Sequence, residues 1–203
     1  MSLGKKLLSK RLVDSTRPYV ILLQETMGDR DSVKLALETL CSGWHFEALD
    51  ARGCLGGLVV GWRCQACHCE NMWGFESSIG LELFSEEPGK VISVISIYRP
   101  YNNRVHLWDS LLNKSFIKDN EVIPGGDLNF SLGGEEVWGP KAVPDPFADF
   151  FIRSFVRSGM VDIATLQLNA TWRNRWSGVD RVAKRLDRFL VDDCVVDLMH
   201  LIR

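Results

Sequence analysis

Residues 122–130 read VIPGGDLNF, an apolar run and two glycines followed by two polar side chains one residue apart. Alternate residues of a β-strand project from the same face, so this spacing predicts that Asp127 and Asn129 present a carboxylate and an amide side by side. Gly125 and Gly126 carry no side chain, which lets a ligand or a metal ion approach the backbone closely. The alternative is a polar turn after a buried strand, because glycine, aspartate and asparagine are common turn residues.

Apolar runs of strand length lie on both sides of this stretch and alternate with segments of helical spacing. One of them, VISVISIY at residues 91–98, is rich in the β-branched side chains that favour strands. Four phenylalanines between residues 147 and 155 share one helix face and predict a core-facing helix that begins near Asp145. The predicted strands cover residues 19–23, 44–48, 58–62, 79–84, 91–98, 121–123, 161–166, 171–174 and 185–191, and the predicted helices residues 3–12, 33–40, 105–117 and 145–159.

This order of elements predicts an α/β chain, because strands alternate with helices and also follow one another at hairpin spacing. We expect mixed sheets in one domain over residues 1–203, since the sequence has no internal repeat, low-complexity tract or interdomain linker. A chain of this length buries roughly 70% of the surface that its unfolded form exposes, which is enough for one core.

The composition excludes several classes of protein. Hydrophobic residues make up 46% and charged residues 25%, as in a folded globular protein, and no apolar run is long enough to span a bilayer. The first residues, MSLGKKLLSKRL, are basic without the apolar core of a signal peptide. We therefore expect an intracellular protein, nuclear or cytoplasmic, with reduced cysteines and no membrane partner. Because the net charge is −2, nucleic acid would have to bind a local basic patch.

Polar residues stand at or near the ends of several predicted strands. They are Glu25, Tyr98, Asp127, Asn129 and Asp187, and three of them are carboxylates. Active sites on α/β scaffolds are built from such strand-end groups. A hard cation such as Mg²⁺ takes oxygen ligands and is typically held by one or two carboxylates with substrate phosphate oxygens. These residues therefore suggest metal-assisted hydrolysis of a phosphoester.

Six short motifs resemble, in order and rough spacing, those of the endonuclease/exonuclease/phosphatase superfamily. The resemblance extends over residues 18–191 and is closest to the endonuclease domains of non-LTR retrotransposons, which are similar to abasic-site endonucleases. Together the motifs are specific, whereas each alone is weak. They are LLQET (22–26), GGLVVGW (56–62), IYRPYNN (97–103), GGDLNF (125–130), TWRN (171–174) and RLDRFLV (185–191).

The resemblance implies a four-layer sandwich of two mixed β-sheets flanked by helices. It also implies that activated water cuts a nucleic-acid phosphodiester with the help of Mg²⁺ or Mn²⁺. Glu25 of LLQET would be a metal ligand. Asp127 of GGDLNF would orient or deprotonate the attacking water and share in metal binding.

The remaining motif residues would contact the substrate or orient its partners. The resemblance implies that Tyr98 hydrogen-bonds the scissile phosphate, with Asn102 as a weaker neighbour. Asn129 would donate to a phosphate oxygen. Asp187 of RLDRFLV would position the histidine that closes the active site in this superfamily.

Two parts of the superfamily pattern are missing from this sequence. The family opens with a strand that carries N-x-R-G and closes with Ser-Asp-His, and neither motif is present. His200 lacks the context of the catalytic histidine. We therefore expect a domain incomplete at both termini, without its first and last strands, and weak or absent activity. The alternatives are a small-phosphoester phosphatase of the same superfamily and a non-catalytic remnant that binds nucleic acid.

A second constellation, RCQACHCE, contains Cys64, Cys67 and Cys69 with His68. The string CQACH matches c-type haem attachment, and three thiols with an imidazole are ligands that zinc accepts. Haem attachment needs an exported, helical setting, however, whereas this stretch continues a strand. Alternation along a strand is also expected to keep the three thiols from converging. We therefore expect neither haem nor zinc.

The segment from Thr171 to Arg188 is basic and contains two tryptophans. Such a run is usually a solvated loop, but beside a phosphoesterase site it predicts contacts with a nucleic-acid backbone, DNA rather than RNA. Trp172 would stack on a splayed base unless it belongs to the core. The other candidate nucleic-acid contacts are Arg173, Asn174, Arg175 and Arg185.

Overall fold

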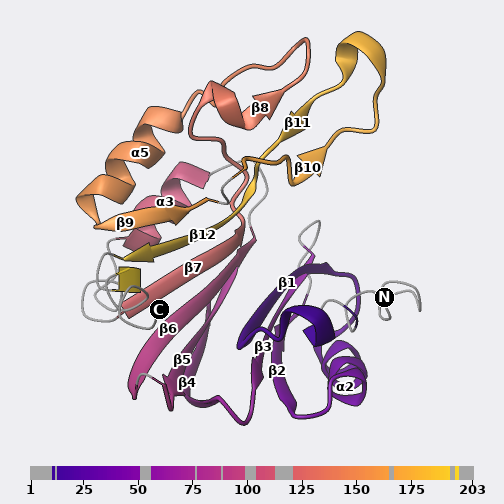
Figure 1. Cartoon of the computed structure of the whole chain (residues 1–203), viewed down its shortest axis with the longest axis vertical. Helices are drawn as coiled ribbons and strands as arrows, with labels where there is room; N and C mark the ends of the chain where they lie inside the picture. The colour runs from indigo at the N-terminus through magenta and orange to yellow at the C-terminus, as the bar shows by residue number, and fades with distance from the viewer. Residues whose placement is uncertain are drawn as a thin grey trace. The chain divides into compact units, whose positions relative to one another are not determined.

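The computed structural model divides into two compact units, Met1–Tyr98 and Arg99–Arg203 (Figure 1). No helix among the described residues is long and apolar enough to cross a membrane. The described residues are 11, 13–50, 56–75, 77–87, 89–98, 104–112, 121–164, 167–192 and 195–196.

The described residues of the first unit form two groups of antiparallel strands and the helix α2, preceded by helical residues at 13–16. In one group β3 lies between β1 and β2, and in the other β5 lies between β4 and β6. The strands are β1 (Val20–Thr26), β2 (Trp44–Leu49), β3 (Gly57–Arg63), β4 (Cys67–Phe75), β5 (Ser78–Ser85) and β6 (Lys90–Tyr98), and the helix is α2 (Arg30–Leu40).

Both faces of β3 are buried, which explains why its sequence reads as a continuous apolar run. Leu58, Val60 and Trp62 pack against apolar side chains of β4, β5 and β6, so the two sheets lie face to face. Val59, on the opposite face, packs with Leu37 of α2 in a second cluster. The first unit is therefore a two-sheet sandwich with a helix on one outer face.

The second unit contains a sheet in which β12 lies between β7 and β9. A smaller antiparallel sheet has the order β10-β11-β8. The helices are α3 (Arg104–Leu112) and α5 (Ala148–Arg157), with 3₁₀ turns η1 (Gly134–Glu136) and η2 (Gly178–Asp180). The strands are β7 (Glu121–Asp127), β8 (Val137–Trp138), β9 (Met160–Ile163), β10 (Trp172–Arg173), β11 (Ala183–Lys184) and β12 (Asp187–Asp192).

An aromatic cluster joins the two helices of this unit to the segment after β7. Phe130 stacks on Phe151 with ring centroids 4.0 Å apart, and Trp108 of α3 meets Phe155 edge to face at 5.4 Å. These four side chains are almost fully buried. The core-facing phenylalanine stripe is confirmed for Phe151 and Phe155, whereas Phe147 lies before the helix and is 45% exposed.

The α/β prediction is confirmed, and most predicted elements lie where the periodicity indicated. The strand predicted at 161–166 ends at Ile163, and the one predicted at 171–174 is reduced to two residues. The short strands β8 and β11 were not predicted, because two residues carry no periodicity. The four-layer arrangement and the single-domain organisation stay predictions, and the helix predicted at 3–12 lies almost entirely outside the described residues.

Candidate active site

Glu25 lies at a β-bulge in β1, where the pairing with β3 changes register between Leu23 and Thr26. Its φ is 54°, in the left-handed region that side chains rarely adopt. Gly56 makes this possible, because a Cβ at that position would lie 2.4 Å from the Cα of Glu25. The bulge turns Glu25 out of the strand's alternation, as bulges near active sites often do.

Tyr98 lies at the end of β6 and contacts Glu25 directly. Its hydroxyl group donates to Oε1 of Glu25 over 2.8 Å. The Tyr98 N–H donates to the carbonyl of Ser77, and the Gln24 side chain donates to the carbonyl of Ile97 over 3.2 Å. The first unit therefore brings two of the predicted site residues together, a carboxylate and a phenol.

Asp127 is the last residue of β7, and Asn129 follows in a turn with φ 55°. The Asn129 N–H donates to Oδ1 of Asp127 over 3.1 Å, so the carboxylate caps the turn. The prediction that both side chains project from one strand face is therefore wrong, and the polar-turn alternative is right. The turn still keeps the two residues adjacent.

Asp187 begins β12 and is paired in register with Asp127 across the β7–β12 ladder. Its side chain is exposed. The backbone N–H groups of Leu186 and Asp187 both donate to Oγ1 of Thr171, at 2.9 and 3.0 Å. A single hydroxyl group of the TWRN motif thus holds the start of the RLDRFLV motif.

Two buried arginines donate to the backbone of the turn that carries Asn129. Arg104 donates to the carbonyl of Asn129, and Arg188 donates to the carbonyl of Phe130 over 3.1 Å. The Arg104 guanidinium also forms a two-pronged ion pair with Asp145, whose Oδ1 accepts over 2.7 Å. The sequence did not indicate that these arginines and Asp145 are buried, because nothing local distinguishes a buried charge from a solvated one.

A buried ionic network lies beside the same turn. Arg185 and Arg188 each bond to both Glu136 and Asp162, at distances of 2.5–3.0 Å. Burial raises the pKa of the Glu136 carboxyl, but hydrogen bonds from Arg188 and from the N–H of Leu132 outweigh it and leave this pKa below its usual range. The hydrogen bond to Asp162 raises the pKa of Arg185.

The prediction that Arg185 contacts nucleic acid is therefore wrong. Its residue is 5% exposed, and both terminal nitrogens of its guanidinium bond within the network. Sequence reasoning could not separate it from the exposed arginines nearby, since all belong to one basic run.

The remaining basic residues lie on the small sheet and its connecting loop. Arg173 and Arg175 are exposed, Trp172 is 42% exposed and Trp176 is 68% exposed. Asn174 closes this loop, because its side chain donates to the carbonyl of Asp180 and accepts from the N–H of Val182. A groove of about 360 Å³ lies here, lined by Trp138, Gly139, Leu168, Asn169, Ala170, Arg173, Asn174, Trp176, Arg181 and Ala183.

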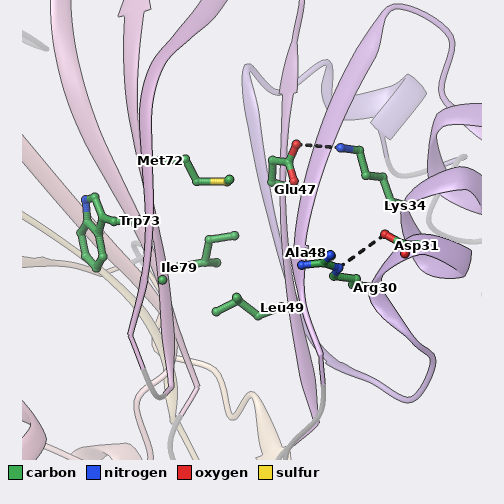
Figure 2. Close-up of a pocket in the computed structure, with 10 residues that line it drawn as sticks. Arg30, Asp31, Lys34, Glu47, Ala48, Leu49, Met72, Trp73 and Ile79 are labelled. Atoms are coloured by element: carbon green, nitrogen blue, oxygen red, sulfur yellow. Dashed lines mark hydrogen bonds and ion pairs between the residues drawn. The ribbon is translucent and has the colours of Figure 1, made fainter.

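The first unit contains a groove of about 320 Å³ that includes none of the predicted site residues (Figure 2). Its charged groups are paired, with Lys34 Nζ 2.7 Å from Glu47 Oε1 and Arg30 Nε 3.5 Å from Asp31 Oδ1. Met72 and Trp73 from β4 line its apolar side, with Leu49 and Ile79.

The cysteines border a separate groove of about 390 Å³ in the first unit. Cys67 is buried and Cys69 half-buried on the same face of β4, where burial raises the pKa of both thiols. Cys64 is exposed in the preceding turn. The described residues contain no group of three or more His, Cys, Asp or Glu side chains arranged to hold a metal ion.

The comparisons with solved structures cover nearly the whole chain. An abasic-site endonuclease from Archaeoglobus fulgidus matches with a TM-score of 0.71 at 16% identity, covering 95% of this chain and 83% of that one. The endonuclease domain of TRAS1, a telomere-specific non-LTR retrotransposon, matches with a TM-score of 0.66 at 12% identity, covering 96% of this chain and 80% of that domain. A mannosyl-6-phosphatase from Bacteroides thetaiotaomicron matches with a TM-score of 0.66 at 12% identity, covering 94% of this chain and 77% of the phosphatase.

This chain has the fold of the endonuclease/exonuclease/phosphatase superfamily. No family model and no curated protein matches the sequence, so the endonuclease/exonuclease/phosphatase fold is identified by structure. The predicted resemblance is confirmed at this level. Asn102 lies outside the described residues.

Proposed function

We propose that this chain is a divalent-metal-dependent phosphodiesterase that cuts nucleic acid, as an endonuclease of the retrotransposon type. The observation that carries the proposal is backbone strain at two of the predicted site residues. Glu25 and Asn129 are two of three non-glycine residues with positive φ in the described part of the chain. Such conformations persist only where the surroundings fix them, and they cluster at functional sites.

The donor atoms fit a hard cation. Glu25 and Asp127 are the proposed metal ligands, since carboxylate oxygens are the ligands that Mg²⁺ and Mn²⁺ prefer. When bound, the ion polarises the phosphoryl group and stabilises the leaving oxygen. Tyr98 orients the Glu25 carboxylate through its hydroxyl group.

The other residues of the proposed site handle the phosphate and the water. Asn129 donates its side-chain amide to a phosphate oxygen, and the Tyr98 hydroxyl group, which has a single proton to donate, turns from Glu25 to the phosphate when substrate binds. Asp127 accepts a proton from the attacking water. Asp187 would position the histidine that closes the active site in this superfamily, and Asn102 would be a weaker neighbour of Tyr98 at the phosphate.

The exposed basic loop of the second unit supports nucleic acid as the substrate. Arg173 and Arg175 offer cations to the phosphate backbone, and Trp172 and Trp176 offer exposed aromatic faces to bases. The Asn174 side chain holds this loop closed through hydrogen bonds to the backbone of Asp180 and Val182. The likeness to a telomere-specific retrotransposon endonuclease and to an abasic-site endonuclease supports DNA rather than RNA as the proposed substrate.

The test is nicking of supercoiled plasmid by the purified chain with Mg²⁺, followed over hours so that slow cleavage is detected. We expect slow cleavage that stops with EDTA and with Asp127→Ala, and that persists in Asp149→Ala, a matched change at an exposed aspartate of α5. Equal cleavage by wild type and Asp127→Ala, or none by either, would contradict the proposal. Single-stranded RNA of matching sequence tests the preference for DNA.

The second candidate is a phosphatase that acts on a small phosphoester. The likeness to a solved mannosyl-6-phosphatase favours it, because that match equals the TRAS1 match in TM-score. Metal-dependent hydrolysis of p-nitrophenyl phosphate without plasmid nicking would select this candidate.

A further inference from the structure

A buried ion pair from two other elements holds the peptide group that follows Asn129. Arg104 is the first residue of α3 and is 1% exposed, and Asp145, which precedes α5, is 7% exposed. The Arg104 guanidinium donates to both carboxylate oxygens of Asp145 and to the carbonyl oxygen of Asn129. One planar group therefore bridges a structural carboxylate and a turn of the proposed site.

Stability alone does not account for this pair. Apolar residues of similar volume often replace a buried ion pair without loss of stability. The surroundings here suit such a replacement, because the guanidinium lies 5.4 Å from the ring centroid of Phe147 and 5.7 Å from that of Phe151. Apolar side chains, however, would not donate the hydrogen bond that the Asn129 carbonyl accepts from Arg104.

Asn129 needs that donor because its backbone conformation is unfavourable. At φ 55° its Cβ crowds the backbone. Two bonds oppose a return to an ordinary conformation, since its N–H donates to Asp127 and its carbonyl accepts from Arg104. The peptide planes on both sides of the Cα are thereby fixed, which also fixes the direction of the Cα–Cβ bond.

We propose that Arg104 is a positioning residue that acts through the Asn129 carbonyl, with Asp145 holding its guanidinium in place. This inference rests on the proposed function, in which the Asn129 amide donates to the phosphate. Arg104 touches no reacting atom. Its contribution is to hold Asn129 in the orientation needed before the substrate arrives.

The deciding variant replaces both charges at once, as Arg104→Met with Asp145→Leu. It removes the donor to Asn129 without leaving a buried charge unpaired. Because the Asn129 carbonyl and the Phe147 N–H, which donates to Asp145 over 2.9 Å, lose these partners, we expect a modest loss of stability to denaturant. We also expect a kcat for plasmid nicking lower by about 10²-fold with KM little changed, and roughly tenfold faster amide exchange at Asn129. Arg104→Met alone leaves Asp145 unpaired and destabilises the fold.

A matched control applies the same two substitutions to an exposed pair of the same unit, as Arg157→Met with Asp109→Leu. These side chains are 64% and 58% exposed, so kcat and the exchange at Asn129 should stay at wild-type values. If the buried double variant fails to fold, Arg104→Lys serves instead. It keeps a charge beside Asp145, but its compact ammonium lacks the fork that serves both acceptors.

Wild-type kcat and wild-type exchange at Asn129 in the buried double variant, or in Arg104→Lys, would overturn the positioning role. If the wild-type chain cleaves nothing, the proposed function fails separately. The exchange rate at Asn129 then still decides whether the ion pair holds this turn.

Discussion

The hydroxyl group of Tyr98 donates a hydrogen bond to Oε1 of Glu25 over 2.8 Å, although the two residues are 73 positions apart in the sequence. Glu25 belongs to β1 and Tyr98 to β6, which lie in different sheets of the first unit. The bond therefore joins the two sheets at the carboxylate that we propose as a metal ligand. The bond fixes the direction of the Glu25 carboxylate, although the Glu25 side chain is exposed.

Tyr98→Phe removes this bond and keeps the ring. Because the bond is open to water, we expect the free energy of unfolding to change by less than about 1 kcal/mol. The nicking rate should fall by ~10²-fold if the hydroxyl group orients Glu25 in the free protein and donates to the phosphate once substrate is bound. Tyr19→Phe, at a tyrosine that is 61% exposed, is the matched control. Unchanged nicking in Tyr98→Phe would remove Tyr98 from the site.

Gly56→Ala should disturb the β-bulge at Glu25. The added methyl group would lie 2.4 Å from the Cα of Glu25, so the backbone has to move. We expect a loss of about 1–3 kcal/mol in the free energy of unfolding and loss of nicking, measured by denaturant titration and plasmid assay. Gly134→Ala, where nothing lies within 4 Å of the new Cβ, should be tolerated. Equal behaviour of the two variants would contradict the steric explanation.

Substitutions of Asn129 should separate stability from activity. Glycine adopts positive φ freely, whereas alanine does not, so Asn129→Gly should be more stable than Asn129→Ala by about 1 kcal/mol. Both variants lack the amide and should lose nicking. The measurement is thermal or denaturant unfolding beside the plasmid assay. An alanine variant at least as stable as the glycine variant would show that the turn is not strained.

The buried network should make stability fall in acid. The pKa of Glu136 is lowered in the folded state from an ordinary value of 4.5, so its contribution is complete above that value and is lost as the pH drops through the lowered pKa. Glu136→Gln should therefore flatten the decline in unfolding free energy as the pH falls below 4.5. Glu135→Gln, at the exposed neighbour, should leave the decline intact. Identical pH profiles for wild type and Glu136→Gln would refute this assignment.

The sequence predicted the strands well where burial alone decides their pattern. The continuous apolar run at residues 58–62 is a strand with two covered faces, and residues 91–98 lie in β6. The sequence also pointed to Glu25 and Tyr98, whose hydrogen bond the structure contains. It did so through motif resemblance, because no local rule links residues so far apart.

The environment of Asn129 was not predictable from local sequence. The i and i+2 spacing of Asp127 and Asn129 suggested one strand face, but β7 ends at Asp127 and the backbone then turns. The buried partners of this turn come from helices and strands elsewhere in the unit. Arg185 illustrates the same limit, since a basic run does not reveal which of its members faces a buried carboxylate.

The two arginines that hold the turn after β7 also bear on the order in which the protein is made. Residues 127–130 leave the ribosome well before Arg188, whose bond to Phe130 spans 58 positions, and the Arg104–Asp145 pair spans 41. Contacts of such separation form late, because the intervening chain has to close first. A nascent chain therefore lacks the hold on Asn129 until synthesis has passed Asp145, and the second bond to this turn until it has passed Arg188.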